Sequence, residues 1–366
     1  MRYFTFVILV ILISCKQVNE KSKISTRKAE IEVVINVHPG VELLTIIQKL
    51  AGKFPKSSPS KYNDEVMEYF SKYKEAKAVE ILRNIDKNIY PDFTELGFCF
   101  SDFPKFKLHI PEKMSWYKYY GEENVKNFLK SCQEFVVETN FWDFYKDHEN
   151  QYKEWSQPIR KGLKEDKLIE KLDAFYKSNS NPPSFYICLD PLNGWGAHAI
   201  VNPELYNPDY EGVKAYTIGF FGNKSKDSAQ PKFEYGSYST NLIWHEGGHI
   251  YLEPIFKKYK KEIDEISYLF NKDDEGMKNQ NISNWEYCLN ENVVRAIVIS
   301  LFKKHKTNRA WKKQNAQEIV NDFIYAEYLS ECILEGYLKN DENQRFEDYF
   351  PFLLKLLKKK FPVKRT

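Results

Sequence analysis

The stretch that decides both the fold and the site is STNLIWHEGGHIYLEP, residues 239–254. It contains the pattern HExxH, in which His245 and His249 are four residues apart. On a helix of about 3.6 residues per turn, both imidazoles project from one face and can bind a single Zn²⁺. Glu246 lies about 100° further round the helix, where its carboxylate can contact a water on the metal. The pattern therefore predicts two metal ligands and a general base on one helix.

The predicted helix has recognisable ends and an unusual middle. Residues 239–241 are favourable N-cap residues, and Pro254 is expected to end the helix because it has no N–H. Gly247 and Gly248 each cost about 1 kcal/mol relative to alanine inside a helix. We therefore expect another element to pack close to the backbone there. The alternative is a core helix with two hydrogen-bonded histidines and no metal.

A catalytic zinc site needs a third protein ligand and leaves the fourth position to water. The metzincin pattern requires Gly at position 252 and His at position 255, where the chain has Leu252 and Ile255. A shorter spacing would place a Glu at position 268, which is Tyr268. In the thermolysin-like pattern the Glu lies on a later helix, often as Asn-Glu, and Glu291 in the segment NENVVRA at residues 290–296 fits this pattern.

Glu291 lies on a predicted helix over residues 285–302. It shares a face with apolar residues that we expect to be buried, and a carboxylate on such a face requires a metal or a cationic partner. The apolar residues of this face are Val294, Val298 and Leu301. The alternative is a surface ion pair between Glu291 and Arg295, one turn apart. Glu253 and Glu286 are rival candidates for the third ligand.

The amino-acid composition limits the kinds of function that the protein can have. The net charge of the 366 residues is +3, so no nucleic-acid partner is indicated. Aromatic residues make up 16% of the chain, which suits a globular protein with many packing positions. Apart from Cys15 there are five scattered cysteines, an odd number that predicts no disulfide framework.

The N-terminus predicts export and a lipid anchor. Arg2 precedes an apolar run over residues 3–13 that is too short to span a membrane. The following Leu-Ile-Ser-Cys, residues 12–15, resembles the cleavage box of bacterial lipoproteins, which would make Cys15 the lipid-modified first residue of the mature chain. Lys16 stands where an inner-membrane lipoprotein commonly carries Asp, which favours the outer membrane, at its periplasmic face, or the cell surface. The alternative is an ordinary signal peptide with a coincidental Cys, and residues 16–30 read as a flexible tether.

Hydrophobic patterning predicts an α+β fold. A strand over 31–37 precedes a mostly helical region to residue 180, with helices over 41–51, 62–73, 76–85, 122–145 and 151–176. Short β-type runs follow at 184–189, 198–201 and 215–221, directly before the HExxH helix. Residues 181–256 thus form a small mixed sheet plus the active-site helix, the arrangement of zincin proteases. Residues 257–366 form a helical C-terminal region, with helices over 258–270, 285–302, 316–339 and 348–360, that supplies Glu291.

Four segments together carry a family resemblance: HEGGH at 245–249, NENVVRA at 290–296, VHPGVELL at 37–44 and LEGY at 334–337. Over most of residues 31–355 the chain resembles a family of bacterial lipoproteins that bear a domain of unknown function and are grouped with gluzincin-type metallopeptidases. The resemblance implies a zincin-like core, with one zinc per chain on His245, His249 and Glu291 and with Glu246 as the base. Thermolysin-type enzymes have an Asp four residues after the ligand Glu, where this chain has Arg295. A cation cannot accept a histidine N–H, so Arg295 would instead orient Glu291 or bind a substrate carboxylate.

The expected function is hydrolysis of peptide bonds by a lipid-anchored, monomeric zinc metallopeptidase of the cell envelope, acting on a peptide or protein. Two alternatives stay open: a zinc hydrolase of the same fold with another substrate, and a catalytically silent binding lipoprotein. Tyr337 is the first candidate for stabilising the oxyanion, with Tyr238 and His198 as others. The remaining histidines receive no functional role; they are His38, His109, His148 and His305.

Overall fold

The computed structural model describes residues 31–54, 59–85, 87–178, 184–194, 196–200, 202–219, 231, 233–271, 275–280, 282–306, 312–313, 323–340 and 344–363. The predicted signal segment, the lipid-modified Cys15 and the tether over residues 16–30 lie outside these residues. None of the described helices combines the length and the apolar character needed to cross a bilayer.

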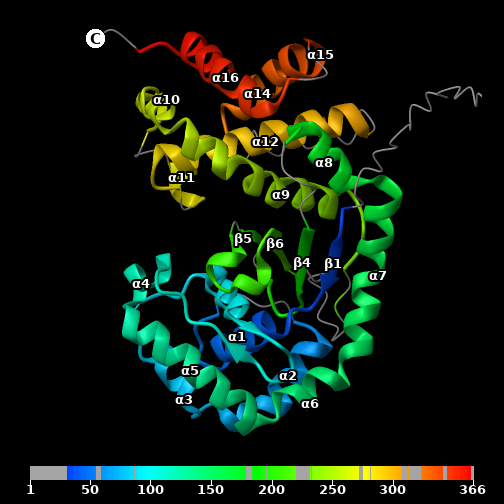
Figure 1. Ribbon diagram of the computed structural model, residues 1–366, viewed down its shortest axis with the longest axis vertical. Coiled ribbons are helices and arrows are strands. Elements are labelled where there is room, and N and C mark those ends of the chain that lie inside the picture. Colours follow the sequence, from blue (N-terminus) through cyan, green and yellow to red (C-terminus); the bar gives the residue numbers. More distant parts are fainter. Residues whose placement is uncertain are drawn as a thin grey trace, which may run out of the picture. The chain divides into compact units, whose positions relative to one another are not determined.

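A four-stranded mixed sheet lies at the centre of the described chain (Figure 1). Its order is β1 (Val33–Asn36), β4 (Ser184–Asp190), β6 (Val213–Gly219) and β5 (Ala197–Ile200). The first three strands are parallel, and β5 pairs antiparallel with β6 at the end of the sheet. The fold is therefore α+β with a small mixed sheet, as the patterning predicts; residues 220–221 of the predicted third β-run are outside the described part.

Most helices of the N-terminal region lie on one side of this sheet, but the last one, at residues 168–176, packs against the HExxH helix on the other side (Figure 1). The first, α1 (Pro39–Leu50), begins at His38, whose Nδ1 accepts hydrogen bonds from the amides of Gly40 and Val41 at 3.1 and 3.3 Å. His38 therefore caps a helix. The other helices of this region are α2 (Lys61–Phe70), α3 (Lys77–Arg83), α4 (Ser115–Tyr120), α5 (Glu122–Thr139), α6 (Phe141–Asp147), α7 (Glu149–Asp166) and α8 (Leu168–Tyr176), with a 3₁₀ helix at Pro91–Cys99 and a short hairpin of β2 (Phe100–Ser101) and β3 (Lys107–Leu108).

Two long helices predicted in this region are each broken in two. The predicted helix over 122–145 is interrupted at Asn140, and the one over 151–176 at Lys167. Both residues adopt left-handed backbone conformations, with φ of 51° and 50°. A left-handed residue ends a helix and redirects the chain, and this is a tertiary choice for a lysine, which has no intrinsic preference for that conformation.

The HExxH segment lies on α9 (Ser237–Lys258), which packs against β5 and β6. The N-cap is Gly236, three to five residues before the predicted cap at 239–241, and Ser239 Oγ accepts from the Gly236 amide at 2.8 Å. The expectation that Pro254 ends the helix is wrong. Proline removes one backbone hydrogen bond and its ring crowds the carbonyl of residue 250, yet the helix continues to Lys258, and the Tyr259 amide donates to the Ile255 carbonyl.

The C-terminal helices lie on the opposite side of the sheet from α1 to α6, together with α8 and α9 (Figure 1). The longest, α12 (Trp285–His305), packs along α9. A π-helical turn at Ile333–Tyr337 interrupts the region predicted as a helix over 316–339, of which residues 316–322 are not described. The other helices here are α10 (Lys260–Asp264), α11 (Glu275–Asn279), α14 (Ala326–Cys332), α15 (Leu338–Asn340) and α16 (Phe346–Lys360).

The two glycines of the motif are required by close packing. A Cβ on Gly247 would lie 2.6 Å from Leu172 Cδ2 on α8, and one on Gly248 would lie 2.5 Å from Val294 Cγ2 on α12. The predicted close approach to the backbone of this helix is therefore confirmed. Since any side chain at 248 would push against α12, Gly248 sets the distance between the two helices that meet at the site.

Candidate metal centre

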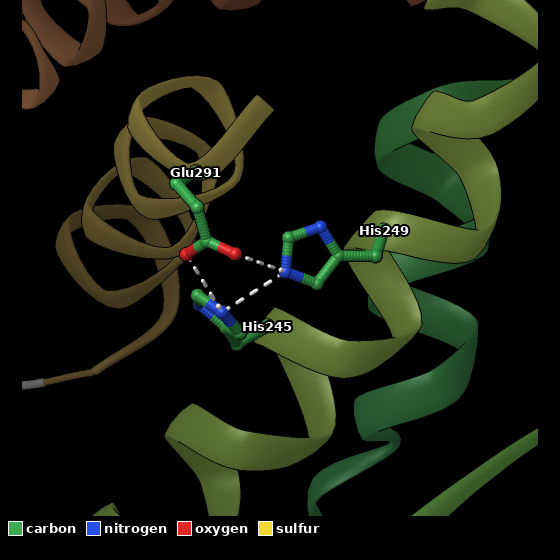
Figure 2. A group of neighbouring side chains, drawn as sticks. All are labelled: His245, His249 and Glu291. Carbon is green, nitrogen blue, oxygen red and sulfur yellow. Dashed lines mark hydrogen bonds and ion pairs between the residues drawn. The ribbon is translucent and has the colours of Figure 1, made fainter. Parts of the chain in front are cut away.

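The two histidines of α9 converge as the helical spacing predicts. Their ring centroids are 4.7 Å apart and the ring planes lie at 85°. The Nε2 atoms of His245 and His249 face each other at 3.1 Å (Figure 2). Two imidazole lone pairs cannot sit this close unless a proton or a cation lies between them.

Glu291 reaches both histidines from α12 (Figure 2). Its Oε1 lies 3.3 Å from His249 Nε2, and its Oε2 lies 3.6 Å from His245 Nε2. Within the described part of the chain, these three residues form the group of metal-ligating side chains whose donor atoms lie within 4.8 Å of one another. The structure therefore brings the three predicted ligands together, from two helices.

The donor spacing suits a small divalent cation. Ligands at 2.0–2.2 Å from a tetrahedral zinc are separated from one another by about 3.3 Å. The three measured separations, 3.1, 3.3 and 3.6 Å, are close to this value. Two imidazoles and one carboxylate also form the ligand set of catalytic zinc sites, with a fourth position left for water.

Asn290 orients the second histidine. Its Oδ1 lies 2.5 Å from His249 Nδ1 and, being a carbonyl oxygen, accepts a hydrogen bond from it. With the proton assigned to Nδ1, Nε2 presents its lone pair to the site. The sequence carries this residue directly before Glu291, but nothing in the spacing reveals that it faces His249.

Arg295 contacts both Glu291 and His245. Its Nη1 lies 2.8 Å from Glu291 Oε2 and 3.1 Å from each ring nitrogen of His245. The Glu291–Arg295 pair expected as an alternative to metal ligation is therefore present, but it is largely buried rather than on a surface. The ion pair and the group of candidate metal ligands therefore share Glu291.

Burial and charge set the protonation of this group. Burial alone raises the pKa of Glu291, but Arg295 and His249 outweigh it and hold the pKa well below its ordinary value. Burial and the positive charge of Arg295 lower the pKa of His245. Burial also acts to lower the pKa of His249, but the Glu291 carboxylate outweighs it and raises the pKa. A carboxylate and a neutral His245, both present at neutral pH, are the forms that bind metal.

Glu246 lies beside this group and is 6% exposed. Its carboxylate accepts a hydrogen bond from the amide of Ala199 on β5. Burial raises its pKa to about 7, with His249 and Arg295 opposing and Glu291 adding to the increase. A carboxylate with this pKa can exchange a proton near neutral pH.

Two tyrosines at the start of α9 and α12 are within electrostatic reach of Glu246. Burial and the charges of Glu291 and Glu246 raise the pKa of Tyr287, which lies one turn before Glu291. Burial and the charge of Glu246 raise the pKa of Tyr238. Both side chains are also half-exposed, at 45% and 55%, so their hydroxyls are protonated donors that solvent can reach. Tyr287 was missed by sequence reasoning, although its i,i+4 spacing from Glu291 was a usable signal.

The other oxyanion candidates lie elsewhere or are already bonded. Tyr337 is 1% exposed and its hydroxyl donates to the Phe175 carbonyl, so the structure assigns it to packing and not to the metal group. His198, on β5, forms a 2.8 Å hydrogen bond through Nδ1 to Thr217 Oγ1. Burial lowers the pKa of His198 to about 3, which keeps it neutral.

The rival ligands are not part of the three-residue group. Glu286 is paired with Lys260 at 3.6 Å and is 45% exposed. Glu253, about one turn after His249, lies close enough to Lys214 for its negative charge to act on that lysine. Neither carboxylate is among the donor atoms that meet at His245 and His249.

Fold and site together define a class: an α+β protein in which two crossing helices carry a His-His-Glu group with a buried Glu beside it. The chain belongs to the family DUF4932, a domain of unknown function, whose family model matches residues 118–356. This match contains the sheet from β4 onward, α9 and α12, so the whole candidate site lies within it. Of the resemblance expected over most of residues 31–355, the domain of unknown function is thus shown over residues 118–356, and the segment at 37–44 precedes the match. Searches of curated proteins and of solved structures found no match.

Proposed function

We propose that this protein is a zinc-dependent metallopeptidase of the gluzincin type. The observation that carries the proposal is the spacing of the three donor atoms of His245, His249 and Glu291, with the Glu246 carboxylate buried beside them. These three residues would hold one zinc per chain, in a zincin-like core made of the mixed sheet and α9.

The chain supplies the remaining groups of a hydrolytic reaction. When bound, zinc would lower the pKa of a water and polarise the substrate carbonyl. Glu246 accepts a proton from the attacking water and delivers it to the leaving amine. Its position is fixed by the Ala199 amide. The hydroxyls of Tyr287 and Tyr238 are the candidates for stabilising the developing oxyanion.

The position of β5 favours a peptide as substrate. This strand ends the sheet on the side of α9, and its Ala199 amide contacts the candidate base. An extended peptide pairs with such an edge through its backbone, which would align its scissile bond along the site. That support is specific to peptides, because other hydrolase substrates have no strand-like backbone to pair.

The lipoprotein-like N-terminus gives this enzyme its location. Lipid on Cys15 would anchor the chain in the bacterial cell envelope, at the periplasmic face of the outer membrane or at the cell surface. Its substrate is then a peptide or protein of that compartment. The nearly balanced net charge of +3 does not indicate a nucleic-acid partner. We assign a monomer, since one chain supplies the full set of ligands.

Metal analysis and a peptide-library cleavage assay test this function on the mature lipoprotein in detergent. We expect one zinc per chain in wild type and in Glu246→Gln, with cleavage only by wild type. Glu253→Gln, a change of the same kind two turns along α9, serves as the matched control and should cleave like wild type. If Glu246→Gln cleaves peptides as fast as wild type, Glu246 is not the general base. A zinc-loaded wild type that cleaves no peptide would favour the non-peptidase hydrolase or the binding lipoprotein.

A further inference from the structure

Arg295 touches two of the three atoms that would face the metal. A single nitrogen, Nη1, lies 2.8 Å from Glu291 Oε2 and 3.1 Å from His245 Nε2. Both distances are those of hydrogen bonds, and a guanidinium can only donate. Because Nη1 is also 3.1 Å from His245 Nδ1, it lies over the face of the imidazole ring, so it donates to Glu291 Oε2 and places its positive charge beside His245.

The other half of the site is free of this contact. Glu291 turns Oε1, not Oε2, towards His249, and Asn290 holds the Nδ1 proton of His249 on the opposite side of the ring. The ligand group thus has one pair of atoms oriented for metal, His249 Nε2 and Glu291 Oε1. The other two atoms, His245 Nε2 and Glu291 Oε2, are in contact with the Arg295 guanidinium.

Arg295 is fixed in this place by packing as well as by charge. Its guanidinium carbon lies 3.7 Å from the centroid of the Phe323 ring, and Phe323 is fully buried. The Arg295 side chain is only 14% exposed. An arginine stacked on an aromatic ring and paired with a buried carboxylate retains its charge, so a divalent ion entering the group meets a positive charge that water screens poorly.

We propose that Arg295 is a built-in competitor of the metal, which holds Glu291 in place while lowering the affinity of the site for a divalent cation. The inference rests on the proposed metal site and deepens it. The same residue stabilises the buried carboxylate through its charge and places that charge beside His245 Nε2 and Glu291 Oε2, where it repels an entering divalent cation. Its removal therefore has two opposite consequences: a less stable protein without metal and a tighter metal site.

The test measures zinc affinity by competition with a chromophoric chelator, on the mature lipoprotein in detergent. We expect Arg295→Gln, which keeps hydrogen-bonding capacity but removes the charge, to bind zinc on the order of tenfold more tightly. Arg295→Lys keeps the charge and should stay within a few-fold of wild type. In parallel, thermal unfolding in chelator should show a lower Tm for Arg295→Gln, and the increase in Tm on adding zinc should be larger than in wild type.

Each outcome separates the inference from the proposed function. If wild type binds no zinc, the metal site fails and the inference fails with it. If wild type binds zinc and Arg295→Gln binds it equally or more weakly, the metal site stands and Arg295 is only an anchor for Glu291. Equal tightening in Arg295→Lys and Arg295→Gln would also overturn the inference, because charge would not be the cause. If Arg295→Gln does not fold, Phe323→Leu serves as a second variant, because it loosens the guanidinium without removing it. We expect Phe323→Leu to bind zinc more tightly than wild type. An unchanged zinc affinity would count against competition by Arg295.

Discussion

Asn290 Oδ1 lies 2.5 Å from Nδ1 of His249, so the residue directly before one member of the ligand group orients another. The two side chains come from different helices, and their contact fixes which nitrogen of His249 faces the site. Glu291 follows Asn290 on the same turn of α12. A single turn therefore supplies both a ligand and the partner of a second ligand.

We expect Asn290→Ala to weaken zinc binding by about 10- to 100-fold, since the Nδ1 proton loses its acceptor and the ring loses its orientation. Asn290→Asp retains the acceptor oxygen and should bind zinc at least as tightly as wild type. Chelator competition on the three proteins provides the measurement. Wild-type affinity in Asn290→Ala would show that the contact is dispensable.

Gly248→Ala should separate α9 from α12. The new methyl group meets Val294 Cγ2 at 2.5 Å, and overpacking of this kind costs about 1–3 kcal/mol. We expect lower stability in urea unfolding and weaker zinc binding, because Glu291 moves with α12. Gly247→Ala, which meets only the end of the flexible Leu172 side chain, should affect zinc binding less. Adding Val294→Ala to Gly248→Ala should restore part of the affinity, and the absence of any rescue would argue that this contact does not set the helix spacing.

Tyr287→Phe should lower kcat by about 100-fold if its hydroxyl serves the oxyanion, with no change in zinc content. Tyr337→Phe should leave kcat unchanged and cost about 1 kcal/mol of stability, through the lost hydrogen bond to Phe175. Steady-state kinetics and urea unfolding of both variants distinguish these roles. Tyr238→Phe, measured alongside, reveals whether the second tyrosine shares the role. The assignment of Tyr287 fails if its variant turns over at the wild-type rate.

Stability should decrease as pH rises through neutrality, owing to a buried carboxyl pair remote from the metal group. Burial, together with the charge of Asp190, raises the pKa of Glu42 to about 8, and burial raises the pKa of Asp190 to about 7. Because the folded-state values lie above the ordinary ones, the folded state binds these protons more tightly than the unfolded state does. The resulting stability is complete below about pH 4 and is lost as pH rises towards 8, at about 1.4 kcal/mol per pKa unit.

Urea unfolding between pH 5 and pH 8.5, with chelator present, measures this effect. The free energy of unfolding of wild type should fall over this range, and that of Glu42→Gln should fall less. Gln can still accept the hydrogen bond that the Tyr62 hydroxyl donates to Glu42 at 2.5 Å, so the substitution removes the charge and preserves the contact. If the free energy of unfolding falls equally with pH in both proteins, the group that titrates is not Glu42.

Cys15→Ser should abolish lipid attachment. We expect wild type to incorporate radiolabelled palmitate and to partition with membranes, and the variant to do neither. Cys332→Ser, a change of a cysteine in the described part of the chain, controls for nonspecific labelling. An unlabelled wild type would indicate an ordinary signal peptide.

Sequence alone determined what depends on helical periodicity. The 3.6-residue repeat places His245 and His249 on one face with Glu246 beside them, and paired glycines indicate a close neighbour. The same reasoning located the strands of the mixed sheet and identified Glu291 as an acid on an otherwise apolar face. These are local properties, carried by a few consecutive residues.

Only the tertiary structure decided which side chains meet across helices. That Asn290 faces His249 and that Arg295 reaches His245 follow from how α12 packs on α9, with Gly248 against Val294. That Tyr337 turns to Phe175 follows from the packing of its segment on α8. The breaks at Asn140 and Lys167 are of the same kind. Such contacts depend on the relative positions of segments far apart in the chain, which long-range packing fixes and residue spacing does not encode.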